Sequence, residues 1–258
     1  MFCLQVSIGA VNDIADVELD RVGKPAKPIP AGMVTVPVAR VWAIGACALG
    51  LALALPSGVP AVAVGAAGLG LGYLYDLSLS RTILAWLPLT LALPLVPVFG
   101  WLGATGGVPS ALVGLVPVAL LAGAALTVAN GLVDVERDVL AGKPTIPVRL
   151  GRARAWVVHA GLFAAAITLA FVLAPAASVV VGGVGVGAGG GPGGIPGVVR
   201  AVGLPLGTVV IVAGAGLLTA ASQGLRERGW ELEGVGTAAI GIGWLAGVAA
   251  LSSGGAGS

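Results

Sequence analysis

The sequence predicts an all-α, polytopic membrane helix bundle, and three observations support this fold class. Of the 258 residues, 57% are hydrophobic and 9% are charged, whereas a soluble domain carries about 25% charged residues. The mean hydropathy of the chain is +1.06. Long apolar stretches rich in Gly and Ala recur between short polar segments, which is typical of helices that pack closely in lipid.

The first helix is expected from Met1 to Asp20 and leads directly into a polar motif. The apolar stretch before Asn12 is shorter than the roughly 20 residues that cross a bilayer. It has no basic segment or small-residue cleavage site, so it is not a signal peptide. We therefore expect that the chain begins inside a helix, with about one and a half spans missing in front.

Seven full spans are expected after this helix. A Pro-containing basic loop at residues 21–32 comes first, because prolines end helices and fix turns. The spans are expected at 36–55, 59–75, 84–103, 110–130, 153–173, 203–222 and 235–251. The Gly-rich part of residues 175–202 fits either a short extra span or a flexible loop.

Charge placement favours the loop at residues 175–202. In that arrangement the loops at 21–32, 76–83, 134–152 and 223–234 lie on one side, and all the acidic residues lie on that side as well. Among the basic residues, only Arg200 lies on the other side. A full span there would move Arg226 and Arg228 across. The positive-inside rule prefers the first arrangement and places the charged face, with its acidic motifs, in the cytoplasm of a multi-pass cell-membrane protein.

Two acidic motifs of equal spacing are the main candidates for function. They consist of Asn12, Asp16 and Asp20, with Asp13 beside them, and of Asn130, Asp134 and Asp138. The i, i+4, i+8 spacing aligns each set along one face of a helix. Like charges one turn apart destabilise a bare helix. A cation between the two lines would remove that cost, and hard oxygen ligands suit Mg²⁺.

The two motifs also mark an internal repeat within a single domain, residues 1–258. Each motif ends a span and precedes a basic loop, Lys24–Pro28 in one case and Lys143–Pro147 in the other. This pattern predicts a pseudo-repeat of about 118 residues, with units near 1–103 and 110–251. The two carboxylate lines would then face each other across a central cavity.

The residue types favour a metal-bridged diphosphate. Mg²⁺ usually takes one or two carboxylates and relies on substrate phosphates for the rest. Asp76 is a further acid at a membrane boundary, where ionisable groups are costly without a function. Basic side chains that would offset phosphate charge are Arg21, Lys24, Lys27, Arg81, Lys143 and Arg149, although ordinary positive-inside charge accounts for about half of them. Neutralising this leaving group would ionise a C–O bond.

Several other residues have simpler interpretations. Cys3 and Cys47 are expected to be small buried hydrophobic residues. His159 has no acid near it in the sequence and is expected to be packed or helix-bonded. Tyr75 precedes Asp76 at a span end, where interface anchoring is an equally good explanation.

At these motifs the sequence resembles the UbiA superfamily of intramembrane prenyltransferases. The resemblance rests on Asn12-Asp13-x-x-Asp16-x-x-x-Asp20, Asp134-x-x-x-Asp138, their basic loops, and Tyr75…Arg81, where Arg stands in place of the usual Lys. It implies a nine-helix bundle whose acidic motifs cap a lipid-open cavity, and Mg²⁺-dependent transfer of a prenyl group from a polyprenyl diphosphate to an acceptor. On this resemblance, the family's first helix and part of its second are expected to be missing from the front of this chain.

The resemblance also implies roles for individual residues. The catalytic and metal-binding set would be Asp13, Asp16, Asp20, Asp134 and Asp138. The substrate-binding set would be Asn12, Arg21, Lys24, Tyr75, Arg81, Asn130 and Lys143. The acceptor is an aromatic acid, a quinone precursor, a porphyrin or a glycerol lipid, and no nucleic-acid partner is expected.

Three alternatives differ in function. A non-catalytic ion or lipid carrier would place its acids near the bilayer midplane, whereas these acids lie at span ends. A phosphatidyl-type alcohol transferase would concentrate its aspartates in one long motif, which this chain lacks. An inactive truncated homologue is the third alternative.

Overall fold

The computed structural model describes residues 1–174 and 195–254, and every regular element among them is helical. The chain forms two compact units that are discontinuous in sequence. Unit 1 comprises Met1–Val108 and Asp134–Arg149, and unit 2 comprises Pro109–Val133 and Leu150–Ser258. Both acidic stretches, from Asn12 to Asp20 and from Asp134 to Asp138, therefore belong to unit 1.

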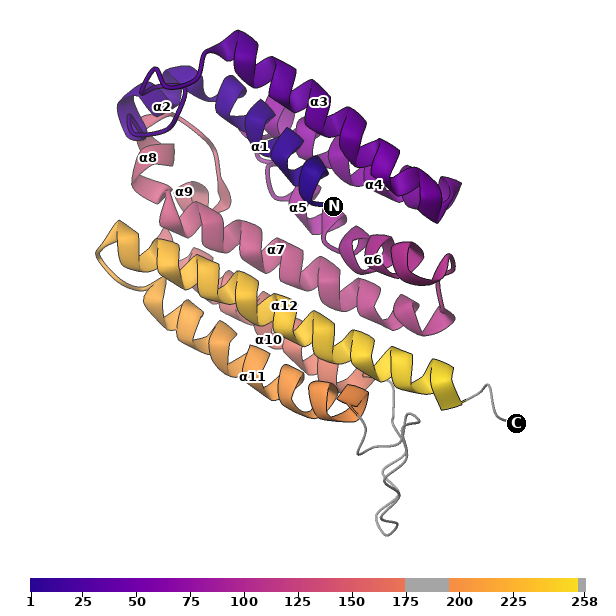
Figure 1. The fold of residues 1–258 in the computed structure, drawn as a ribbon. Helices are drawn as coiled ribbons and strands as arrows, with labels where there is room; N and C mark the ends of the chain where they lie inside the picture. Colours follow the sequence, from indigo (N-terminus) through magenta and orange to yellow (C-terminus); the bar gives the residue numbers. More distant parts are fainter. Residues whose placement is uncertain (175–194, 255–258) are drawn as a thin grey trace. The chain divides into compact units, whose positions relative to one another are not determined.

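Unit 1 holds the N-terminal helices and the short helices that follow the second motif (Figure 1). Its helices are α1 (Phe2–Ala15), α2 (Val17–Gly23), α3 (Val36–Ala54), α4 (Val59–Leu74), α5 (Leu87–Ala92), α6 (Leu95–Thr105), α8 (Val135–Leu140) and α9 (Ile146–Leu150). Short 3₁₀ and π turns at Leu55–Ser57 and Tyr75–Leu79 extend α3 and α4.

Glycines allow α1 to approach its neighbours closely in unit 1. A Cβ on Gly50 of α3 would lie 2.6 Å from the Leu4 side chain, and one on Gly72 of α4 would lie 2.6 Å from Ile8. Leu4 and Ser7 of α1 are buried as a result. This packing fixes α1 against two membrane helices just before the first acidic motif begins.

In its described residues, unit 2 has four long helices and a short 3₁₀ turn, Ser110–Gly114. The helices are α7 (Leu115–Val133), α10 (Arg152–Leu173), α11 (Ile195–Leu217) and α12 (Gln223–Gly254). Figure 1 shows α11 and α12 running side by side. A Cβ on Gly207 would lie 2.5 Å from the Gly236 carbonyl oxygen, and one on Gly214 would lie 2.6 Å from that of Gly229. The backbones of α11 and α12 are so close at these positions that no side chain larger than that of glycine fits between them.

The prediction of seven spans is confirmed. Among the described residues, seven helical stretches are long and apolar enough to cross a membrane: Val36–Ser57, Val59–Leu79, Leu87–Thr105, Ser110–Val133, Arg152–Leu173, Gly197–Leu217 and Gln223–Ala250. The helix Phe2–Ala15 is apolar but shorter. The chain is thus a multi-pass integral membrane protein with an all-α fold.

Two boundaries near the C-terminus were predicted wrongly. The expected loop at 223–234 is the first part of α12, and residues 195–202, assigned to the far-side loop, already belong to α11. The remainder of that loop, 175–194, lies outside the described residues. Two of the polar residues that suggested a loop at 223–234, Arg226 and Glu233, are instead buried against partners. The Arg226 guanidinium is 1% exposed and donates to the carbonyl oxygens of Ala221 at 2.8 Å and Val133 at 3.2 Å.

Candidate functional site

Both acidic motifs contain a break at their middle aspartate. Helix α1 ends before Asp16, whose φ and ψ are −98° and 8°, and α7 ends before Asp134, whose φ and ψ are −102° and 12°. These angles lie in the sparsely populated region where active-site residues are frequent. The next helix starts immediately, because Asp20 N–H donates to the Asp16 carbonyl and Asp138 N–H donates to the Asp134 carbonyl, both at 2.8 Å. The sequence predicted an uninterrupted helix through each motif, whereas the helix is broken at Asp16 and at Asp134.

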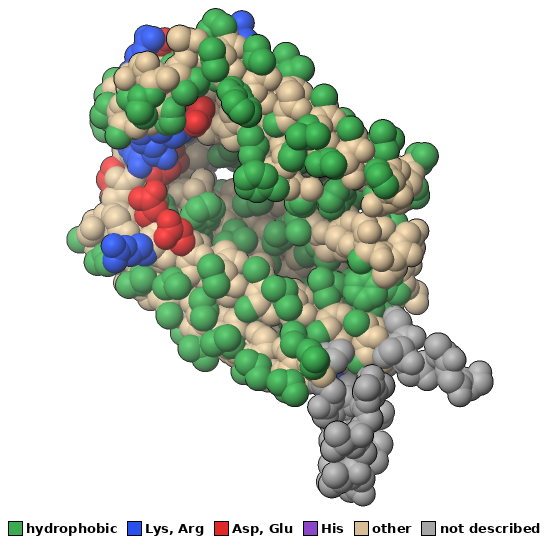
Figure 2. All heavy atoms as spheres, in the orientation of Figure 1, with side chains coloured by type: hydrophobic (Ala, Val, Ile, Leu, Met, Phe, Trp, Pro, Cys, Tyr) green, Lys and Arg blue, Asp and Glu red, His purple; other side chains and the backbone are tan. Residues whose placement is uncertain are grey.

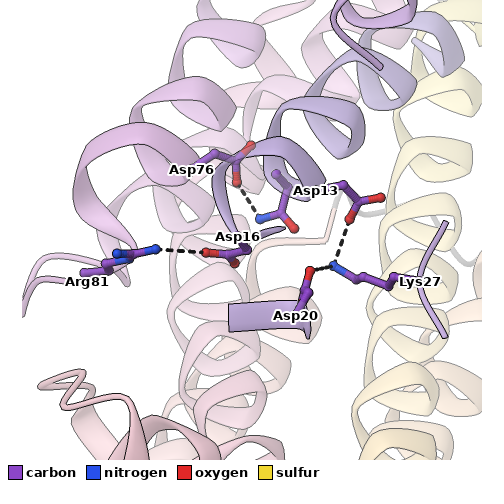
Figure 3. A network of polar contacts seen from close by, with 7 residues as sticks. Asp13, Asp16, Asp20, Lys27, Asp76 and Arg81 are labelled. Carbon is purple, nitrogen blue, oxygen red and sulfur yellow. Dashed lines mark hydrogen bonds and ion pairs between the residues drawn. The ribbon is translucent and has the colours of Figure 1, made fainter. Parts of the chain in front are cut away.

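Lys27 joins two carboxylates of the first motif. Its Nζ donates to Asp13 Oδ1 at 2.8 Å and to Asp20 Oδ2 at 2.6 Å (Figure 3). Burial alone lowers the pKa of Lys27, but the hydrogen bonds and charges of the two carboxylates outweigh it and raise the pKa above its ordinary value. Asp20 therefore shares Lys27 with Asp13. The sequence spacing had placed Asp13 outside the helical face that carries Asn12, Asp16 and Asp20.

The other two polar residues of this motif contact the segment after α4. Asn12 Nδ2 donates to Asp76 Oδ1 at 2.9 Å, and Arg81 Nη2 lies 3.6 Å from Asp16 Oδ1 (Figure 3). Asp76 lies in the π-helical turn Tyr75–Leu79, which the Ser80 N–H closes by donating to the Tyr75 carbonyl at 2.8 Å. Such π turns are frequent at functional sites.

The aspartates of the second motif are held by one residue of α8 and one residue of the loop that follows it. Arg137 Nη2 lies 2.9 Å from Asp134 Oδ1, and Thr145 Oγ1 donates to Asp138 Oδ2 at 3.0 Å. Burial raises the pKa of Asp138 above its ordinary value, although the Thr145 hydrogen bond and the Lys143 charge act in the opposite direction. As in the first motif, the carboxylates of the second motif therefore have basic side chains nearby, and Asp138 also has a hydroxyl donor.

The two motifs approach each other within unit 1. A Cβ on Gly23, the last residue of α2, would lie 3.3 Å from Arg137 Cδ in α8. Figure 2 shows acidic and basic side chains gathered at the end of unit 1 that carries α2 and α8. Residues far apart in the sequence therefore form one polar cluster.

The remaining predicted site residues occupy different surroundings. Arg21 forms an exposed ion pair with Glu18 at 2.9 Å. Lys24 and Lys143 are half-buried just beyond the ends of α2 and α8. Asn130 lies in α7, which belongs to unit 2. Their roles in substrate binding stay predictions.

Three contacts of the cluster were not assigned from the sequence. Lys27 had been grouped with the loop charges, Asp76 with the boundary acids, and Thr145 had been given no role. A Lys seven residues after Asp20 and a Thr seven residues after Asp138 offered a shared spacing. No pattern in the sequence connected Asp76 to Asn12. The π turn that brings Asp76 next to Asn12 leaves no trace in the hydropathy of the chain.

Comparison with known proteins shows the same fold and family signature. Residues 1–204 match the UbiA prenyltransferase family. Digeranylgeranylglyceryl phosphate synthase of Pyrococcus abyssi is 31% identical over 150 residues, which cover 57% of this chain and 53% of that protein. The chain thus spans about half the length of curated relatives of this kind.

Solved structures of archaeal homologues share the fold. A UbiA homologue from Aeropyrum pernix K1 superposes with a TM-score of 0.69 at 20% identity, covering 93% of this chain and 84% of that one. A UbiA homologue from Archaeoglobus fulgidus bound to GPP and Mg²⁺ gives a TM-score of 0.64 at 19% identity, covering 97% and 87%. The all-helical architecture is therefore the one seen in these proteins.

Proposed function

The chain belongs to the UbiA prenyltransferase family, and from this membership we propose that it transfers a prenyl group from a polyprenyl diphosphate to an acceptor within the membrane. The observation that carries the proposal is that the aspartates of both acidic motifs lie in one compact unit, where the end of α2 at Gly23 approaches Arg137 of α8. Carboxylates brought together from distant segments need a cationic partner to offset their repulsion.

The donor set suits Mg²⁺ held jointly with a diphosphate. Among residues 1–174 and 195–254, no three His, Cys, Asp or Glu side chains converge closely enough to hold an ion alone. An Mg²⁺ ion bound here would need phosphate oxygens as further ligands, since Mg²⁺ sites that handle phosphates use only one or two carboxylates per ion. The ammonium of Lys27 between Asp13 and Asp20 supports the view that this cluster attracts cations. Asp16, Asp134 and Asp138 would supply the principal metal ligands, with Asp13 and Asp20 beside them.

The proposed reaction needs the protein to bind and orient charge. When bound, Mg²⁺ neutralises the diphosphate and so favours its departure from the allylic carbon. Arg81, which is largely exposed and lies 3.6 Å from Asp16, would contact the diphosphate as Asp16 turns to the metal. Lys24 and Lys143 would add positive charge from the two loops. No covalent intermediate with the protein is required, because the acceptor attacks the exposed allylic carbon.

The relatives suggest the substrate class. Several of them are digeranylgeranylglyceryl phosphate synthases, a name that describes a glyceryl phosphate carrying two geranylgeranyl groups. We take the donor to be geranylgeranyl diphosphate and the acceptor to be a glyceryl phosphate that already bears one such chain. This acceptor is a lipid, so it would reach the site from the bilayer. The positive-inside rule places the charged end of unit 1 on the cytoplasmic side.

A direct assay tests the proposal. The purified chain is incubated with radiolabelled geranylgeranyl diphosphate, geranylgeranylglyceryl phosphate and Mg²⁺, and lipid product and released pyrophosphate are measured. We expect both to appear together and both to stop when EDTA removes the metal. Parallel reactions with 4-hydroxybenzoate as acceptor would reveal a preference for an aromatic substrate.

The same assay separates the carrier alternative. A carrier binds the diphosphate but releases no pyrophosphate, whereas a prenyltransferase releases one pyrophosphate for each product formed. Binding of the diphosphate without turnover of either acceptor would contradict the proposed activity.

A further inference from the structure

Asp76 lies outside the two acidic motifs but contacts the first residue of one of them. Its side chain is buried, with 6% exposed, and its Oδ1 accepts a hydrogen bond from Asn12 Nδ2 at 2.9 Å. Its second oxygen, Oδ2, is buried and has no hydrogen-bond partner among the described residues. Figure 3 shows its carboxylate beside the motif that contains Asp13 and Asp16.

This contact determines which end of the Asn12 amide faces Asp76. A carboxylate oxygen accepts and an amide nitrogen donates, so the nitrogen turns toward Asp76. The carbonyl oxygen of Asn12 is then directed away from Asp76. An amide carbonyl is a hard oxygen ligand of the kind that Mg²⁺ binds, whereas the amide nitrogen is a donor that a cation repels.

We propose that Asp76 is a positioning residue that holds the Asn12 carbonyl oxygen toward the metal–diphosphate complex. The inference rests on the proposed function, because it assigns a partner to that same site. Residues that orient a metal ligand through a hydrogen bond typically change metal affinity by about 10- to 100-fold when they are replaced. The π-helical turn supplies the required geometry, since it places Asp76 one residue after Tyr75 and against α1.

The test measures metal binding without turnover. Mn²⁺ binding to the full chain in detergent is titrated by electron paramagnetic resonance in the presence of inorganic pyrophosphate. We expect Asp76→Ala to weaken Mn²⁺ binding by about 10-fold. Asp76→Asn retains an oxygen that accepts from Asn12 and is expected to stay within about threefold of the wild type.

A double-mutant cycle distinguishes positioning from a general structural role. If Asp76 acts through Asn12, Asp76→Ala has no further effect on Mn²⁺ affinity in an Asn12→Ala background. Additive losses, or an Asp76→Asn loss as large as that of Asp76→Ala, would overturn the inference and make Asp76 a direct ligand. Equal affinity of Asp76→Ala and the wild type would overturn it as well.

Two controls keep the outcome clear. Folding of each variant is checked by its thermal unfolding, and Asp76→Leu, which keeps the shape without an acceptor, replaces Asp76→Ala if that variant does not fold. Asp134→Ala should abolish the signal if the proposed site is correct. A wild type that binds no Mn²⁺ with pyrophosphate contradicts the proposed function, whereas wild-type binding that is insensitive to Asp76 contradicts only this inference.

Discussion

His159 Nε2 lies 2.9 Å from Glu233 Oε1, and both side chains are fully buried within unit 2. The two residues come from α10 and α12, so the contact joins two membrane helices. The His159 ring also meets Phe163 edge to face, with ring centroids 5.3 Å apart. Polar groups buried this deeply depend on each other, because neither reaches water.

Removing one partner of this pair should destabilise the protein strongly. His159→Leu or Glu233→Leu leaves the other polar group buried without its partner, which typically costs about 3–5 kcal/mol. The double variant His159→Leu/Glu233→Leu should cost much less, because an apolar pair replaces both groups. Thermal unfolding in detergent measures the effect, and Glu231→Leu, an exposed acid of the same helix, is the matched control. A double variant as unstable as the sum of the singles would contradict the coupling.

This pair also shows where sequence reasoning on the fold succeeded and where it stopped. Hydropathy alone located the seven spans, because a membrane helix needs a long apolar run and little else. The start of α12 was missed because Arg226 and Glu233 look like loop residues in the sequence. Their partners, the Val133 carbonyl and His159, lie far away in the chain. Such long-range pairing has no local pattern.

The glycine contact between α11 and α12 leads to a second prediction. A Cβ on Gly207 would lie 2.5 Å from the Gly236 carbonyl oxygen, a distance that backbone atoms can relieve only by moving apart. Gly207→Ala should therefore lower the thermal stability, by about 1–3 kcal/mol as in other overpacked sites. Gly216→Ala in the same helix has open space around its Cβ and should be neutral or slightly stabilising. Equal melting temperatures for the two variants would argue against close contact of these helices.

The second motif provides the most direct test of catalysis. Asp134→Ala removes a carboxylate that lies 2.9 Å from the Arg137 guanidinium. We expect prenyl transfer to fall by about 100-fold or more, the scale seen when a charge-stabilising group is lost, while membrane insertion is retained. Glu18→Ala removes an exposed acid of the first motif, paired only with Arg21 in the described contacts, and should keep nearly full activity. Full transfer by Asp134→Ala would exclude the role assigned to it.

The site itself was only partly readable from the sequence. Spacing identified both motifs, because equal i, i+4, i+8 patterns are rare in apolar helices. It predicted straight carboxylate lines, whereas the chain kinks at Asp16 and Asp134 and turns Asp20 toward Lys27. Helical periodicity cannot show such a kink, since φ and ψ at one residue redirect every side chain after it. The contact between Asn12 and Asp76 depends on the same tertiary detail.

The acid limb of the activity profile should depend on Thr145. Burial raises the pKa of Asp138, and the hydrogen bond from Thr145 Oγ1 at 3.0 Å opposes that rise. Thr145→Val removes this hydrogen bond, so the pKa of Asp138 should rise further. If Asp138 must be ionised to hold the metal, activity is lost as pH falls through that pKa, and the acid limb of the variant should move to higher pH.

The raised pKa of Asp138 also determines how the stability of the Thr145→Val variant depends on pH. Because the folded-state pKa of Asp138 exceeds the unfolded one, its contribution to the free energy of unfolding is fully present below the unfolded value. That contribution is lost as pH rises through the folded pKa. Thr145→Val should therefore lose stability relative to the wild type mainly above this window, where the ionised carboxylate lacks its donor, by about 1 kcal/mol. The Thr168 hydroxyl donates to the Ala164 carbonyl of its own helix, so Thr168→Val should leave both profiles unchanged. A Thr145→Val profile that overlays the wild type at acid pH would mean that Asp138 does not control the limb.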